Sequence, residues 1–173
     1  MRINLRVALA GLIALVAIGA VWSGLADAKP LAAVTAGGSL KSATLVIDYG
    51  TKSNRPIASF DLMDLPTGAS GWDLFQAAGI AVQGTDQFPS GFVCRIDGWP
   101  NKSLQDCADT PAFDEGHWAY YVTNSSIGSG WVWSGQGAAT HIPGCGGYEG
   151  WSWVAPGEDA KPPRFSISPR ACK

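Results

Sequence analysis

The residues that most often carry acid–base chemistry are few in this chain and lie apart from one another. It has two histidines, His117 and His141, and neither lies near a nucleophile motif such as a Gly-x-Ser-x-Gly turn. Asp114 and Glu115 are adjacent carboxylates, but neighbouring side chains on an extended chain point in opposite directions, which suits a catalytic pair poorly. We therefore expect no enzymatic activity and no cofactor.

Aromatic rings show the clearest spacing in the sequence. The chain has 8 Trp, and the segments 117–124 (HWAYYVTN), 131–133 (WVW) and 151–153 (WSW) place rings two residues apart. Successive side chains of a β-strand point to opposite faces, so rings at this spacing lie side by side on one face. One face of each strand must belong to the core. The number of rings nevertheless predicts that some of them reach the surface, where they can bind a ligand.

A ligand-binding surface is our first interpretation of these rings. If Trp118 and Tyr120 pack against a helix that carries Trp72 and Phe75, then Tyr121 faces outward. The candidate ligand-binding residues are Tyr120, Tyr121, Asn124, Trp131, Trp133 and Trp151. Such a surface suits stacking on a small planar or macrocyclic ligand, and a flat glycan or an envelope transporter component are the alternative partners.

The cysteines predict covalent cross-links. Cys94, Cys107, Cys145 and Cys172 are four in number, and an even number in an exported chain indicates two disulfides with three possible pairings. We favour Cys94–Cys107, which closes a loop rich in turn formers, and Cys145–Cys172, which ties the C-terminal tail to the body. A zinc site that uses Cys145 with His141 is the alternative, but the chain lacks CxxC and HxxxH spacing, so we expect no metal.

The first residues predict export. An uncharged apolar run, 7–21, follows two arginines and precedes the small-x-small sequence at 26–28 that signal peptidases accept. We assign 1–28 as a signal peptide and 29–42 as a flexible leader, and we expect a secreted or extracytoplasmic domain with no stable membrane insertion after cleavage. A retained membrane anchor is the alternative, since the run is only slightly shorter than the about 20 residues that span a bilayer.

Composition narrows the class of the exported part. The net charge is −2 and the basic residues are scattered, which argues against nucleic-acid binding and against electrostatic binding to a membrane. Charged residues make up 15% of the chain, and it has 22 Gly, which favours a turn-rich β structure over a helical bundle. We assign one domain to 43–155 and a Pro-rich, irregular tail to 156–173.

Local patterns predict the elements of an α+β domain. The segments 43–49 and 56–62 are rich in β-formers or alternate in polarity, and they predict a hairpin. The segment 70–79 begins with a Ser-x-x-Asp capping box and ends at a glycine, which predicts a helix of two or three turns. The segment 91–98 predicts a strand that ends in an Asp-Gly turn, and the three aromatic segments predict further strands.

This order of elements resembles a family of exported domains. The segments Ile96-Asp97-Gly98, Trp118 to Asn124 and Gly150 to Trp153 are similar to motifs of the C-terminal β-grasp domain of transcobalamin and intrinsic factor. With Cys94 and Cys107, the chain looks most like the exported actinobacterial proteins that are encoded beside energy-coupling-factor transporters. One departure is that Gly147-Tyr148-Glu149 replaces the late turn that usually contains Asp.

The resemblance implies a β-grasp-like mixed sheet with one short helix packed across it. It also implies a ligand or partner held at a rim or face of that sheet, by analogy with a fold that has many functions. We accordingly expect a secreted, non-catalytic binding domain that holds a small, vitamin-like ligand such as a corrinoid and serves an uptake transporter. A cell-envelope interaction or glycan-binding protein with an exposed Trp surface is the alternative.

Overall fold

The computed structural model describes residues 39–112, 114–123, 130–170 and 172 of the 173-residue chain. The predicted signal peptide and the predicted leader as far as residue 38 lie outside this part. Within the described residues, no helix has the length and apolar character that a bilayer crossing requires.

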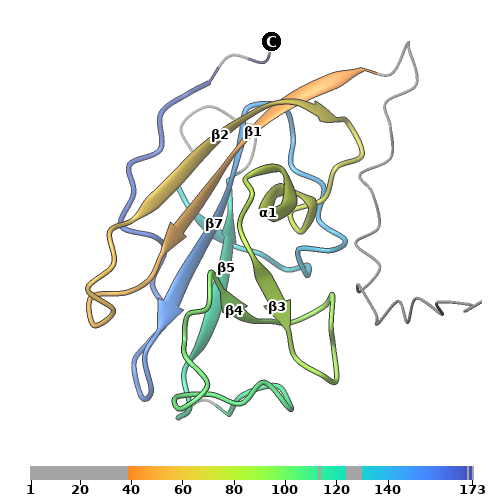
Figure 1. The fold of residues 1–173 in the computed structure, drawn as a ribbon. Helices are drawn as coiled ribbons and strands as arrows, with labels where there is room; N and C mark the ends of the chain where they lie inside the picture. Colours follow the sequence, from red (N-terminus) through yellow and green to blue (C-terminus); the bar gives the residue numbers. More distant parts are fainter. Residues whose placement is uncertain (1–38, 113, 124–129, 171, 173) are drawn as a thin grey trace, which may run out of the picture. The chain divides into compact units, whose positions relative to one another are not determined.

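The described residues form a five-stranded mixed sheet, a two-stranded sheet and one short helix (Figure 1). The elements are β1 (Leu40–Asp48), β2 (Ala58–Pro66), α1 (Asp73–Ala77), β3 (Val82–Gly84), β4 (Val93–Ile96), β5 (His117–Val122), β6 (Val132–Trp133) and β7 (Gly147–Val154). The main sheet has the order β2-β1-β7-β5-β6, in which β1 and β7 are parallel and the other neighbours are antiparallel. β3 and β4 form the second sheet. The predicted α+β class and the predicted strands are confirmed.

The two central strands are buried on both of their faces. Every residue of β7, and every residue of β1 after Leu40, is buried. Strands of this kind have near-continuous apolar sequences, as the run Leu45-Val46-Ile47 shows, because neither face can turn to water. The edge strand β2 instead alternates between exposed and less exposed positions. The central pair therefore needs one layer of cover on each side.

The first layer of cover is α1 with β3 and β4. Ser70 and Asp73 form the predicted capping box, since the Ser70 amide and hydroxyl donate to Asp73 Oδ2 at 2.9 and 2.8 Å and the Asp73 amide donates to Ser70 Oγ at 3.3 Å. The helix is shorter than predicted, with 5 residues, and it buries Leu74 and Phe75 completely. Burial of a Phe side chain contributes about 1.5–3 kcal/mol. The Phe75 ring lies 5.5 Å from that of Trp151 on β7, which fixes the helix against the sheet.

The second layer of cover is the C-terminal tail, which Figure 1 shows beside β1 and β2. Arg164 donates to both carboxylate oxygens of Asp48 on β1, from Nε at 2.8 Å and from Nη2 at 2.6 Å. The hydroxyl of Tyr148 on β7 donates to the carbonyl of Ser168 at 2.8 Å, and Arg170 pairs with Asp61 on β2 at 2.7 Å. The tail has no helix or strand in its described residues, as predicted, yet these contacts make it part of the packed domain.

The two disulfides have the favoured pairing. Cys94–Cys107 joins β4 to the loop that follows it, and Cys145–Cys172 joins the turn before β7 to the end of the tail. Each bridge restricts the unfolded chain and contributes about 2–4 kcal/mol. The disulfides also indicate that the domain matures in an oxidising, extracytoplasmic environment.

The start of the domain differs from its predicted position. β1 begins at Leu40, so Lys41 and Ser42 belong to the sheet and not to a leader that extends to residue 42. Lys41 is only 4% exposed because its ammonium group donates to the carbonyls of Ala69 and Pro143, each at 2.8 Å. A charged residue after an Ala- and Gly-rich stretch has the composition of a linker, which is why the sequence placed the boundary too late.

We predict that Asp48→Asn lowers the free energy of unfolding by about 1.5–3 kcal/mol, because hydrogen bonds to charged groups contribute this much. Burial acts to raise the pKa of Asp48, but hydrogen bonds from Arg164 and from the Gly50 amide hold it below its ordinary value. Asp61→Asn is the matched control, since Asp61 also pairs with a tail arginine but is half exposed. It should cost less than about 1 kcal/mol. Urea unfolding measures the free energy of unfolding of both variants. An equal loss of stability in the two would contradict the prediction.

Candidate functional site

The structure divides the predicted ring positions between two sides of the sheet. Tyr120 and Trp151 lie on the helix side, where their rings stack with centroids 4.5 Å apart and an interplanar angle of 18°. They are 8% and 4% exposed and belong to the main core. This corrects the expectation that these two side chains line a ligand-binding surface, because α1 and the loops around it cover them.

The other described ring positions gather on the tail side, near the edge strand β6. We call Tyr121, Trp131 and Trp133 the aromatic edge. Trp133 pairs with Tyr121 across β5 and β6, and the two rings meet edge to face with centroids 5.3 Å apart. Trp133 is 54% exposed, whereas Tyr121 is buried beneath the surface that Trp133 presents. The prediction that some Trp reaches the surface is confirmed at this position.

Trp131 is held in place by close packing on β7. Its indole N–H donates to the carbonyl of Phe165 in the tail at 3.1 Å, and its ring meets that of Tyr148 at 85°. Gly150 makes this approach possible, since a Cβ there would lie 2.5 Å from the Trp131 ring. The glycine and the tail together fix one boundary of the aromatic edge.

Within the part of the chain that the structure describes, polar groups at the aromatic edge are limited. Burial raises the pKa of Tyr121, so its hydroxyl stays neutral at physiological pH. Asn124, the predicted hydrogen-bonding residue of this site, lies outside the described residues. The arrangement is thus an apolar, ring-lined edge that suits stacking, with hydrogen bonding as a secondary contribution.

A second candidate site, which we call the Glu149 cluster, lies on the helix side. It consists of Lys41, Tyr120, His141 and Glu149. The Glu149 side chain is completely buried, and the Tyr120 hydroxyl donates to its Oε2. His141 Nδ1 lies 3.0 Å from Glu149 Oε1 and 3.3 Å from the Tyr120 hydroxyl. Oε1 accepts no well-aligned hydrogen bond from the described residues, so the proximity of the imidazole balances its charge.

The pKa values in the Glu149 cluster follow from burial and from this contact. Burial raises the pKa of Glu149, although His141, Tyr120 and Lys41 all act to lower it. The contact with Glu149 raises the pKa of His141, and burial lowers that of Lys41. Buried ionisable groups with specific partners are frequent at functional sites, but they also occur in purely structural networks.

The Glu149 cluster was not predicted from the sequence. The signal that could have revealed it is the period of β7, because Glu149, Trp151 and Trp153 alternate and therefore share one face. A carboxylate on a face of buried rings must have partners nearby. Gly71 shows how tightly they pack, since a Cβ there would lie 2.4 Å from the Tyr120 hydroxyl and 2.9 Å from Glu149 Oε2.

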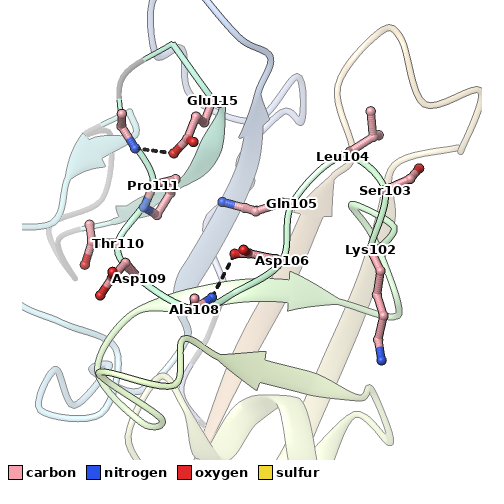
Figure 2. Close-up of a pocket in the computed structure, with 11 residues that line it drawn as sticks. Lys102, Ser103, Leu104, Gln105, Asp106, Ala108, Asp109, Thr110, Pro111 and Glu115 are labelled. Atoms are coloured by element: carbon pink, nitrogen blue, oxygen red, sulfur yellow. Dashed lines mark hydrogen bonds between the residues drawn. The ribbon is translucent and has the colours of Figure 1, made fainter.

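A third feature is an open pocket of about 600 Å³ in the loop between β4 and β5. Figure 2 shows one arm of this loop with Leu104 and a second with Pro111, and Gln105 points from the first arm toward the second. Asp106 and Glu115 accept hydrogen bonds from the loop amides of Ala108 and Ala112 at 2.9 and 2.8 Å, so these carboxylates serve the loop itself. None of the described ring positions lines this pocket.

The structure also shows where the residues of the alternative zinc site, Cys145 and His141, and the second histidine, His117, are engaged. Cys145 is bonded to Cys172 and cannot act as a thiolate ligand beside His141. Among the described residues, no group of three or more His, Cys, Asp or Glu side chains is placed to hold a metal ion. His117 begins β5 and is half-buried, and burial lowers its pKa.

Comparison with protein-family models finds no match for this chain, and comparison with curated protein sequences finds no relative.

We predict that Glu149→Ala lowers the free energy of unfolding by about 3–5 kcal/mol, because it leaves the buried Lys41 and the partly buried His141 without their anion. Glu149→Gln should cost less, since it keeps an acceptor for Tyr120 and removes the buried charge. Glu115→Ala is the control, because Glu115 is exposed and should contribute less than about 1 kcal/mol. Urea unfolding followed by circular dichroism measures all three. A Glu149→Ala loss no greater than that of the control would show that the cluster is not a stabilising unit.

Proposed function

We propose that this chain is a non-catalytic binding domain that works outside the cytoplasm and holds a small, vitamin-like ligand at the aromatic edge. The observation that carries the proposal is the exposure of Trp133, on the edge strand β6, beside Tyr121 on β5. A flat or macrocyclic ligand that stacks on this 54% exposed indole would remove apolar ring surface from water, which is favourable.

The strand order supports the fold implied by the resemblance to the transcobalamin C-terminal domain. A hairpin, β1 and β2, is followed by α1, and the last strand β7 returns parallel to β1 at the centre of the sheet. On the support of this strand order and of the resemblance, we propose that the domain is of the β-grasp type. An extracytoplasmic domain of this type beside an uptake transporter is suited to the capture of a scarce vitamin, including a corrinoid.

The buried polar groups favour binding over catalysis. His141, the histidine with a carboxylate partner, directs Nδ1 toward Glu149 and Tyr120 in the core. The four cysteines are bonded in disulfides and offer no thiolate nucleophile. Stacking on the aromatic edge depends mainly on rings, and Trp131 and Trp133 with the underlying Tyr121 supply them.

We predict that Trp133→Ala weakens binding of a corrinoid such as cyanocobalamin by about 30-fold or more, because a ring that binding buries at the centre of a site contributes about 2 kcal/mol or more. Isothermal titration calorimetry measures this without relying on indole fluorescence. Phe88→Ala is the matched control, since Phe88 is 48% exposed but lies in the loop between β3 and β4. The Phe88→Ala variant should bind the corrinoid with the same affinity as the native chain.

The same preparation distinguishes the alternative function. Retention on insoluble glycan that Trp133→Ala abolishes, with no corrinoid binding, would replace the vitamin proposal with a cell-envelope role. Co-purification with a membrane transporter in the absence of small-molecule binding would instead identify the aromatic edge as a protein interface. Corrinoid binding that Trp133→Ala leaves unchanged would place the ligand elsewhere on the domain.

A further inference from the structure

We infer that the Glu149 cluster couples the protonation of His141 to the closure of the loop between β6 and β7, so that loss of this proton loosens the loop. The loop, residues 134–146, begins directly after Trp133. The opening of the loop requires no ligand, whereas its effect on ligand binding rests on the proposed function. A change in pH would then alter how firmly β6, the strand that carries the exposed Trp133, is held.

The loop is fixed to the rest of the domain at three places close to the Glu149 cluster. The amides of Gly71 and Trp72 donate to the carbonyls of His141 and Ala138, at 2.9 and 3.0 Å. The Lys41 ammonium group donates to the carbonyl of Pro143. His141 is held twice, because its imidazole lies against Glu149 while its carbonyl binds Gly71. A change in the charge of this side chain therefore acts directly on the backbone contacts of the loop.

Five titratable groups face one another here, each from a different element. Lys41 comes from β1, Asp73 from α1, Tyr120 from β5, Glu149 from β7 and His141 from the loop. Lys41 binds two backbone carbonyls, Asp73 binds Ser70, and the neutral Tyr120 hydroxyl donates to Glu149. The His141 side chain is 24% exposed and so can exchange its proton with solvent. Its ordinary pKa of 6.5 also lies closest to neutral pH.

The sign of the coupling follows from the contact between His141 and Glu149. Because this contact raises the pKa of His141, the closed loop holds the proton more tightly than an open loop does. The extra stability of the closed state is fully present below the ordinary pKa of 6.5 and is lost as pH rises through the raised value. One proton can change the closing equilibrium by at most about tenfold per pH unit. The raised pKa of Glu149 also favours the closed loop at low pH, and this contribution is lost at a lower pH than that of His141. The lowered pKa of Lys41 has the opposite effect, because it favours the closed loop at high pH.

Opening of the loop would change the aromatic edge because the two are continuous. The Ser134 amide, one residue after Trp133, donates to the Tyr120 carbonyl at 3.0 Å and keeps β6 beside β5. β6 has only 2 residues and depends on this neighbouring contact for its position. A loosened loop therefore leaves the exposed indole less firmly oriented.

Native-state hydrogen exchange of the full-length chain tests the inference without a ligand. Protection of the Gly71 and Trp72 amides, corrected for the intrinsic pH dependence of exchange, should fall above about pH 6.5 by up to about tenfold per pH unit. The Thr85 amide, which donates to the Phe92 carbonyl at 3.0 Å, is the internal control and should keep constant protection. In His141→Gln, which retains a hydrogen-bond donor but does not titrate, the decline at Gly71 and Trp72 should disappear. Constant protection in the native chain, or a decline that persists in His141→Gln, would overturn the inference.

A second measurement covers the case in which His141→Gln fails to fold. The imidazole of His141 is titrated by NMR in the native chain, and its midpoint is compared with the pH at which Trp72 protection declines. Coincident midpoints support the coupling, and separate midpoints overturn it. Trp133→Ala should retain the pH dependence even if it loses ligand binding, which separates a failure of this inference from a failure of the proposed function.

Discussion

The parallel pairing of β1 with β7 is the constraint on which the rest of the domain depends. The register joins Ala43 to Gly147 and continues to Asp48 beside Ser152. Parallel strands cannot be joined by a short turn, so everything between them in the sequence forms the connection. A central parallel pair is stable only when both faces are covered. The helix with the small sheet covers one face, and the disulfide-tied tail covers the other.

The distribution of aromatic rings is a consequence of this two-sided cover. Alternation along β5 and β7 directs Trp118, Tyr120 and Trp151 toward the helix and Tyr121 toward the tail. Near β6 the tail binds the indole of Trp131 and leaves the next ring on that face, Trp133, exposed. The exposed indole thus marks the place where the second layer of cover ends.

Features encoded by neighbouring residues could be predicted from the sequence, whereas features that need distant partners could not. The hairpin, the capping box of α1 and the aromatic strands follow from short-range patterns. Loop composition favours the Cys94–Cys107 pairing, and the second pair then joins the two remaining cysteines. The burial of Lys41 and Glu149 depends on carbonyls and side chains that are up to 102 residues away in the sequence. Which rings become core likewise depends on what covers each face, and for this reason the sequence does not reveal that the candidate ligand-binding residues Tyr120 and Trp151 are enclosed in the core.

The buried charges are better explained by positioning than by stability. A buried ion pair often contributes no more than well-packed apolar residues of the same volume would, because both ions lose their hydration. The partners of the Glu149 cluster are not arbitrary, however. Lys41 binds the carbonyls of Ala69 and Pro143, and His141 binds both Glu149 and the Gly71 amide. Apolar side chains would fill this space equally well but could not specify which loop carbonyl meets which strand. The charges therefore fix the position of two connecting loops against the sheet, including the loop that leaves the edge strand with the exposed ring.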